Sequence, residues 1–154
     1  TSKIVVGNQS YKIKIFETII DGSEHFALIN GKLTKKTTPR LRVISSNVVE
    51  NYLINQNIPN SFNRTIKYFK KFTNCVLIFI RDPNLKSVSQ TLRQYKSDDF
   101  YKKGQDRLIK NYGIGAQIIK SLNIKNMVLV TKSRKKVVGL EGYGIKIVKQ
   151  EILK

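Results

Sequence analysis

The order of apolar and polar residues gives the first part of the chain a strand-rich character. Residues 11–15 (YKIKI) alternate apolar and basic side chains, which is the period of a half-buried strand. Residues 25–29 (HFALI) predict a second strand after the turn signal DGS, and residues 41–44 (LRVI) predict a short third one. Residues 45–63 are rich in Asn and Ser, so we expect mostly loop there, with a turn of helix near residues 48–53.

Helical and strand patterns then alternate. Residues 64–72 (RTIKYFKKF) place Ile66, Phe69 and Phe72 at helical spacing, with lysines on the outer face. The continuous apolar run at residues 75–81 (CVLIFIR) predicts a strand covered on both faces. Further helices are expected at residues 88–100 and 116–122, and strands at residues 127–131 (MVLVT) and 145–148 (IKIV). The predicted fold class is α/β: a mixed β-sheet with flanking helices and an N-terminal β-hairpin at one edge.

Length and composition favour a single domain over residues 1–154. The chain is 40% hydrophobic, and it has neither an internal repeat nor a Pro/Gly/Ser-rich linker. Its longest apolar run, residues 76–80, is far shorter than the roughly 20 residues that span a bilayer. No charged-then-apolar leader opens the chain, so we expect a cytoplasmic protein without a membrane segment. Because the chain begins at Thr1 rather than Met, we expect trimming or a cut from a longer polypeptide.

Charge and cysteine content describe the surroundings of the protein. With 29 Lys and Arg against 10 Asp and Glu the formal charge is +19, which attracts phosphates, nucleic acid or anionic membranes. Lys, Asn and Ile are enriched together, and compositional drift with solvated lysines is the simpler interpretation. Cys75 stands alone, so no disulfide forms within the chain and no Cys/His cluster has zinc-ligand spacing. A reducing cytoplasm fits this pattern.

Four segments carry a resemblance to a known family. They are DGSEHFAL (residues 21–28), RVISS (42–46), NYGIGAQIIKSLNI (111–124) and LVTKSRKKVVGLEGYGIKIV (129–148). In this order and at this spacing they resemble GTP cyclohydrolase II, the zinc enzyme that opens the guanine ring at the start of riboflavin synthesis. The resemblance covers nearly the whole chain and implies the fold of that family and a homodimer. It also implies a domain often fused behind a dihydroxybutanone phosphate synthase domain.

The metal site of that family is changed in this chain. The family holds zinc with three cysteines, in a C-x10-C-x-C pattern directly after the segment that corresponds to RVISS. The matching positions here are Asn47, Ile58 and Asn60. Two neutral amides and a branched alkyl group do not replace three thiolates as zinc ligands. We therefore expect no zinc and no other cofactor.

The catalytic positions depart from the family in the same way. The proton-accepting Asp and the nucleophilic Arg of the family correspond to Leu108 and Lys110, although a shifted register brings Asp106 near the first position. Leu cannot move a proton, and a solvated Lys is protonated at neutral pH. The family's EGR triplet is replaced by residues 83–85 (PNL).

Some nucleotide-binding positions are retained. Arg42 and Ser45 lie in the phosphate-binding segment of the resemblance, and Thr131 and Lys136 match a threonine and a lysine that contact the nucleotide in the family. Weak binding of a nucleotide or another anion is therefore expected at these four residues. His25 has no carboxylate or nucleophile partner at a suggestive spacing, so we expect a structural role for its ring.

The sequence thus favours a GTP cyclohydrolase II-like domain without catalytic activity, which supports a fused or associated dihydroxybutanone phosphate synthase. The alternative is a basic module that binds RNA or another polyanion on the same scaffold. Residues 67–72 (KYFKKF) mix aromatic rings with lysines, and residues 132–136 (KSRKK) form a compact basic run. A third possibility, a metal-free enzyme for a phosphorylated substrate, lacks any nucleophile and base pair in the sequence.

Overall fold

The computed structural model describes residues 1–47, 49, 53, 58–82, 86–97, 113–132 and 140–153. These residues form one seven-stranded sheet with helices packed around it. The strands are β1 (Ser2–Val6), β2 (Gln9–Glu17), β3 (Glu24–Asn30), β4 (Arg40–Ser46), β5 (Cys75–Arg81), β6 (Asn126–Thr131) and β7 (Lys146–Ile152). The helices are α1 (Ile58–Phe69), α2 (Ser87–Tyr95), a helix over residues 113–121 and the short 3-10 helix η2 (Glu141–Tyr143).

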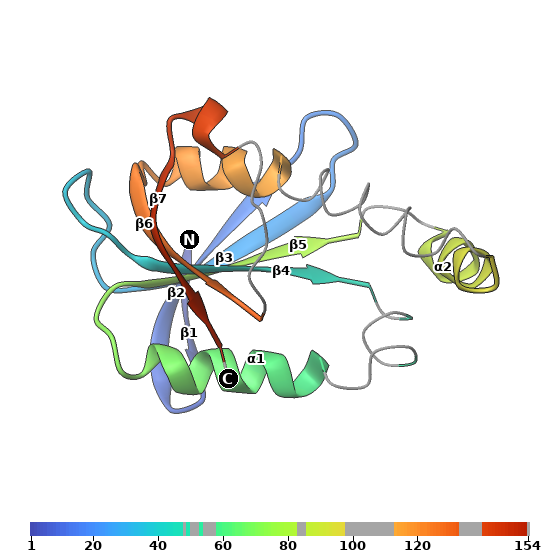
Figure 1. Ribbon diagram of the computed structural model, residues 1–154, viewed down its shortest axis with the longest axis horizontal. Coiled ribbons are helices and arrows are strands. Elements are labelled where there is room, and N and C mark those ends of the chain that lie inside the picture. The colour runs from blue at the N-terminus through green and yellow to red at the C-terminus, as the bar shows by residue number, and fades with distance from the viewer. Residues whose placement is uncertain are drawn as a thin grey trace.

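The sheet is mixed, with strand order β1-β2-β3-β5-β4-β6-β7 (Figure 1). β1, β2, β3 and β5 pair antiparallel in succession, whereas β4 pairs parallel with both β5 and β6, and β6 pairs parallel with β7. The carboxyl ends of β4, β5, β6 and β7 therefore meet at the same edge of the sheet. In open α/β sheets this edge is where ligands bind.

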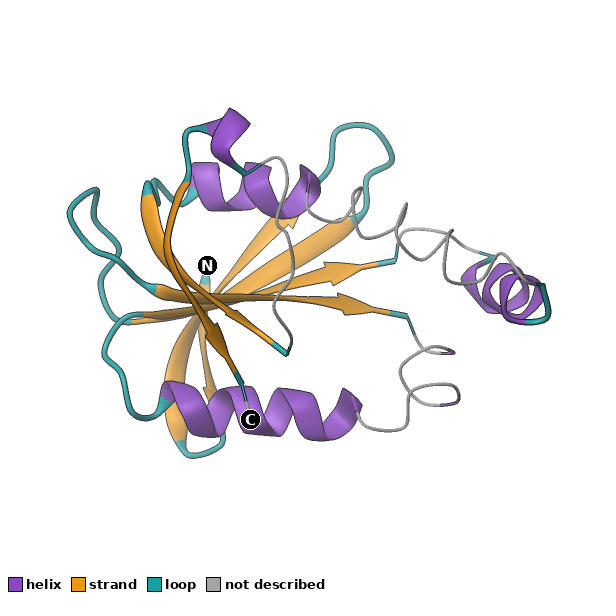
Figure 2. Ribbon diagram, in the orientation of Figure 1, coloured by secondary structure: helices purple, strands orange, loops and turns teal. Residues whose placement is uncertain are grey.

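Helices cover both faces of the sheet, with α1 on one side and the helix over residues 113–121 on the other (Figure 2). β5 contributes to both layers because its residues alternate. Val76, Ile78 and Ile80 join the core beneath the helix over residues 113–121, whereas Cys75 and Leu77 join the core beneath α1. The continuous apolar run of β5 thus follows from burial on both faces.

The structure confirms the predicted α/β class, the mixed sheet and its central strands, and it corrects three details. β1 was not predicted; it pairs with β2 and forms the edge strand of the sheet, outside the β2–β3 hairpin. α1 begins at Ile58, within residues predicted to be loop, because Pro59 fits the first turn of a helix, where a missing N–H breaks no bond. α2 ends at Tyr95, before the end of the predicted helix, whose residues 98–100 lie outside the described residues. Most of the predicted turn of helix near residues 48–53 also lies outside the described residues.

One glycine is required by close backbone contact. Gly31 follows β3 with φ of 90°, a conformation that L side chains rarely adopt. A Cβ at this position would collide with the carbonyl of Thr73 and the side chain of Asn74. The end of β3 therefore packs directly against the loop that leads into β5.

Among the described residues, no helix has the length and apolar character needed to cross a membrane.

Candidate functional site

The carboxyl edge of the parallel strands carries a polar cluster. β4 ends in Ser46 and is followed by Asn47, β5 ends in Arg81 and is followed by Asp82, and β6 ends in Thr131. Ser46 lies opposite Arg81 in the parallel register, and the Asp82 N–H donates to the Ser46 carbonyl at 3.2 Å. The strand pairing thus continues one residue beyond β5 and fixes the start of the following segment.

Asn47, at the first of the three cysteine positions of the resemblance, joins three parts of the fold. Its Nδ2 donates to Asp82 Oδ2 at 3.1 Å and to Thr91 Oγ1 of α2 at 2.9 Å. Asn47 is 7% exposed and Thr91 is 2% exposed, so these bonds are sheltered from water. The side-chain amide therefore ties α2 to the ends of β4 and β5.

His25 has a structural position beside this edge. The Arg81 N–H donates to His25 Nδ1 at 3.0 Å, and His25 Nε2 lies 3.2 Å from Ser23 Oγ. Because Nδ1 accepts a hydrogen bond, the neutral ring carries its proton on Nε2, which donates to Ser23. Burial is the main cause that lowers the pKa of His25 below 6.5. The ring holds the β2–β3 turn against the end of β5.

Arg42 is a buried cation with neutral partners. Its guanidinium donates to Thr65 Oγ1 at 3.0 Å and to Ser61 Oγ at 2.6 Å, both on α1, and the residue is only 6% exposed. Neither partner is a carboxylate. Burial lowers the pKa of Arg42 to about 10. Arg42 is thus a buried cation held by two hydroxyl groups.

The three predicted anion-binding residues that the structure describes, Arg42, Ser45 and Thr131, do not share one face of the sheet. Leu41 packs in the core beneath the helix over residues 113–121, so alternation puts Ser45 on that face and Arg42 on the α1 face. Thr131 alternates with the buried Leu129 and faces the same layer as Ser45. Thr131 Oγ1 is buried, and no group in the described part of the chain forms a hydrogen bond with it.

Several predicted positions fall outside the described residues. They are Lys136, Leu108, Lys110, Asp106 and residues 83–85. Ile58 and Asn60 are described as part of the first turn of α1.

Cys75, the single cysteine, lies at the opposite end of the strands. It pairs with Arg40 at the start of β4, six residues from the Ser46–Arg81 pair, which corresponds to about 20 Å along the strand. It is fully buried, and its Sγ lies 3.7 Å from the Phe69 carbonyl. Burial raises its pKa to about 12. Cys75 is therefore a core residue remote from the carboxyl edge.

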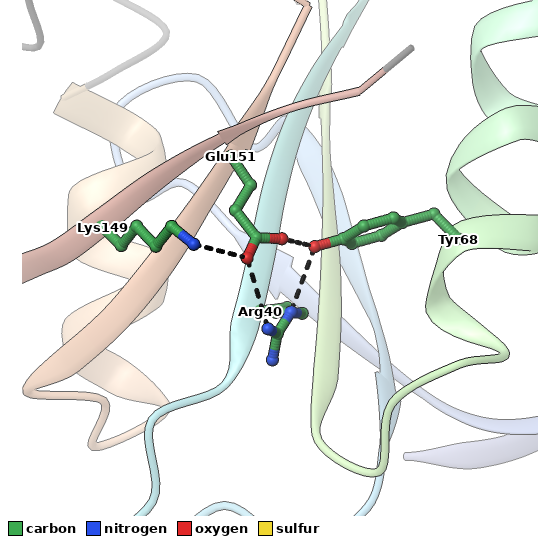
Figure 3. Close-up of polar contacts among 4 residues, drawn as sticks. All are labelled: Arg40, Tyr68, Lys149 and Glu151. Carbon is green, nitrogen blue, oxygen red and sulfur yellow. Dashed lines mark hydrogen bonds and ion pairs between the residues drawn. The ribbon is translucent and has the colours of Figure 1, made fainter.

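A second polar cluster, which the sequence did not indicate, joins β4, α1 and β7 (Figure 3). Arg40 donates from Nε to Tyr68 Oη at 3.1 Å and from Nη2 to Glu151 Oε1 at 3.3 Å, and Tyr68 donates to the other oxygen of Glu151. Lys149 pairs with the same carboxylate at 3.5 Å, and the Arg40 guanidinium lies 3.5 Å from the centre of the Phe72 ring. These residues are far apart in sequence, so no spacing pattern reveals them.

Comparison with known proteins assigns this arrangement to a family. The fold is an α/β domain whose polar residues gather at the carboxyl ends of its parallel strands. A model of the GTP cyclohydrolase II family matches residues 3–151. The chain belongs to the GTP cyclohydrolase II family, a domain found in riboflavin biosynthesis proteins.

The relatives share about a quarter of their residues with this chain. The monofunctional riboflavin biosynthesis protein RIBA 2, chloroplastic, of Arabidopsis thaliana is 26% identical over 89% of the chain and 30% of its own length. The riboflavin biosynthesis protein RibBA of Bacillus subtilis is 26% identical over 90% of the chain and 38% of its own length. The bifunctional riboflavin biosynthesis protein RIBA 1, chloroplastic, of Arabidopsis thaliana is 28% identical over 86% of the chain and 27% of its own length. The chain thus spans between a quarter and two fifths of these relatives.

Proposed function

We propose that this chain is a catalytically inactive GTP cyclohydrolase II domain, which supports a fused or associated dihydroxybutanone phosphate synthase in riboflavin biosynthesis. The observation that carries the proposal is the state of Asn47. At the position of the first zinc cysteine stands a buried amide whose nitrogen already donates to Asp82 and Thr91. The Asn47 side chain ties α2 to the ends of β4 and β5, and these hydrogen bonds would be lost if the side chain turned toward a metal ion.

The donor set at these positions does not fit zinc. Structural and catalytic zinc sites use thiolate, imidazole or carboxylate ligands with free lone pairs, and an amide nitrogen that donates two hydrogen bonds has none to offer. The side chain of Ile58 carries no donor atom. Among the described residues, no group of three His, Cys, Asp or Glu side chains lies close enough together to hold a metal ion.

The proton-transfer position argues in the same direction. In the register that aligns Leu108 with the family's proton acceptor, an alkyl side chain stands at this position, and it neither accepts nor donates a proton. In that register the ring-opening step lacks both an activated water and a base, whereas the shifted register brings Asp106 near the position.

We propose that a weaker property survives, the binding of a phosphate or nucleotide at the carboxyl edge. Arg42 lies on the α1 face, where its guanidinium bonds to hydroxyl groups alone, and it contributes to the proposed site only through its charge. On the opposite face, Thr131 presents a buried hydroxyl for which the described residues supply no partner. Buried polar groups of this kind are rare in folded proteins unless a ligand or water completes them. Ser45 and Lys136 complete the proposed set.

Turnover of GTP with release of formate tests the inactivity. The purified chain is incubated with GTP, Mg²⁺ and added Zn²⁺, and an active member of the family serves as the positive control. We expect no formate above the protein-free background, and GTP-dependent formate release in proportion to the chain concentration would refute the proposal. The variant Asn47→Cys/Ile58→Cys/Asn60→Cys checks the assignment of the positions. It should acquire zinc while remaining inactive, because Leu108 is unchanged.

We also propose that the chain forms a homodimer. Two apolar groups on the described surface suit such contacts. One is the β2–β3 turn, where Ile19 and Ile20 are 102% and 99% exposed, and the other is the outer face of α2, with Val88, Leu92 and Tyr95. Sedimentation equilibrium should give twice the chain mass, and the variant Ile19→Ser/Ile20→Ser should weaken association if the turn takes part. A chain that stays monomeric at high micromolar concentration would exclude the dimer.

A further inference from the structure

The outward face of α1 is a continuous basic surface, which we call the basic ridge. It consists of Arg64 and Lys67 on the helix and of Lys70 and Lys71 directly after its last residue, and all four side chains are exposed. The helical bond from the Lys70 N–H to the Ile66 carbonyl, at 3.2 Å, keeps Lys70 in line with the helix. Arg64 and Lys71 are seven residues apart, which corresponds to about 10 Å along the helix axis.

The charges of the ridge are not compensated within the described fold. Among the described residues, none of the four side chains has a hydrogen-bond or ion-pair partner, and no Asp or Glu occurs in the sequence between residues 51 and 81. Glu151, the carboxylate that contacts α1 through Tyr68, is already bound by Arg40, Lys149 and Tyr68 (Figure 3). Cations three and four residues apart on a helix repel one another, so the ridge lowers the stability of the helix that carries it. A polyanion would remove this repulsion.

The aromatic residues of the same segment are turned inward. Phe69 is fully buried, Tyr68 donates its hydroxyl hydrogen to Glu151, and Phe72 lies beneath the guanidinium of Arg40. Proteins that bind single strands present exposed rings on which bases stack. Because the rings beside the ridge are occupied, the ridge offers charge without a stacking platform.

The ridge also lacks the features of a membrane surface. Helices that lie in a bilayer interface combine cations with large apolar side chains that enter the lipid. In the described part of α1 and the turn after it, no large apolar side chain is exposed. A regular row of cations without rings or apolar anchors matches the phosphate ladder of a double helix, where two strands supply one charge per about 1.7 Å of axis.

We propose that the basic ridge binds the phosphate backbone of double-helical nucleic acid, RNA or DNA, without reading its sequence. This activity does not depend on the proposed function of the carboxyl edge, because the ridge lies on the outer side of α1 and shares no residue with that edge. The ridge residues contact phosphates as point charges and a guanidinium fork, and no base contact is involved.

The test is the salt dependence of binding to a labelled 20-base-pair duplex, measured by fluorescence anisotropy between 50 and 200 mM salt for RNA and DNA separately. Three to four phosphate contacts predict that the affinity falls by about 40- to 150-fold over this range. The variant Arg64→Gln/Lys67→Gln/Lys71→Gln should bind at least about tenfold more weakly at 50 mM salt, with a salt slope shallower by about 2 to 3. The matched control Lys12→Gln/Lys32→Gln/Lys125→Gln removes three exposed lysines scattered over the fold and should change the slope by less than about 1. Thermal melts verify that both variants fold.

Preference for duplex RNA over duplex DNA, or the reverse, identifies the source of the phosphates and supports the proposal in either case. Equal losses in the ridge variant and the control would overturn it, because the binding would then come from the net charge of the whole surface. The proposal would also be overturned if the chain bound single strands of the same length, or vesicles with anionic lipid, more tightly than either duplex. The absence of duplex binding at 50 mM salt would overturn it as well.

Discussion

Two arginines on the same face of β4 should respond in opposite directions when each is replaced by methionine. Arg42 is enclosed beneath α1 with hydroxyl partners alone. Arg40 is half-buried and bonds to Glu151 and Tyr68 above the Phe72 ring. Methionine has a similar length and no charge, so the pair of variants separates the energetic effect of the charge from that of packing volume.

The magnitudes follow from the surroundings of each arginine. The fall in the pKa of Arg42 from 12.5 to about 10 means that burial disfavours its charged form by on the order of 3 kcal/mol. Loss of the two hydrogen bonds from the charged guanidinium to Thr65 and Ser61 costs about 1.5 kcal/mol each, and burial of the methionine side chain in their place gains on the order of 1 kcal/mol. We therefore expect Arg42→Met to stabilise the fold by about 1 kcal/mol. Arg40→Met removes an ion pair, a hydrogen bond and a cation–π contact, and should destabilise the fold by about 1 to 3 kcal/mol.

Thermal unfolding by circular dichroism measures both effects. A domain of this length has an unfolding entropy of roughly 0.3 kcal/mol per kelvin, so Arg42→Met should raise Tm by about 3 °C and Arg40→Met should lower it by about 3 to 9 °C. Millimolar phosphate should raise Tm of the unsubstituted chain more than that of Arg42→Met, because the anion compensates the buried charge. A loss of stability in Arg42→Met as large as that in Arg40→Met would refute the reasoning and make Arg42 a structural residue.

Three further outcomes follow from buried groups. His25 is the only histidine, and its pKa is lowered in the folded chain, so its contribution to stability is complete above pH 6.5 and is lost as the pH falls below that value. Urea titrations should therefore show the free energy of unfolding declining by up to about 1.4 kcal/mol per pH unit. The decline should be absent in His25→Asn, whose Oδ1 can accept the same hydrogen bond from the Arg81 N–H. Gly31→Ala should destabilise the fold by at least about 2 kcal/mol in the same titrations, whereas a neutral result would show that the Thr73 loop moves aside. Cys75, whose pKa is raised to about 12, should react with iodoacetamide at pH 8 only after unfolding, and rapid labelling of the native chain would contradict its burial.

The central strands could be predicted because burial leaves a direct record in the sequence. β5 and β6 lie inside the sheet, and a continuous apolar run of strand length is the pattern expected of a strand that is buried on both faces. β1 has no such apolar run, since four of its five residues are exposed; it is held by pairing with β2 and by Val6, which packs against the core beneath α1. The start of α1 was hidden by the loop-like residues Pro59, Asn60 and Asn63, although a proline in a first turn is itself a helix signal.

The sequence predicted which positions belong to the candidate site, but not the partners that their side chains contact. The resemblance identified Asn47 as the place of a missing ligand, but its partners Asp82 and Thr91 lie 35 and 44 residues away, and no local pattern connects them. The same holds for Arg40 and Glu151, which are 111 residues apart. Hydrogen bonds between distant segments depend on the register of the sheet, which the periodicity of single segments does not determine.

The zinc content of the purified chain shows whether the metal site of the family is lost in this protein. The chain is produced in zinc-supplemented medium and dialysed without chelator, and its zinc content is measured by inductively coupled plasma mass spectrometry. An active family member and the Asn47→Cys/Ile58→Cys/Asn60→Cys variant are measured beside it. We expect a zinc content near zero for the unsubstituted chain, and a content approaching one zinc ion per chain for the other two proteins. A stoichiometric zinc ion in the unsubstituted chain, retained through dialysis, would contradict it.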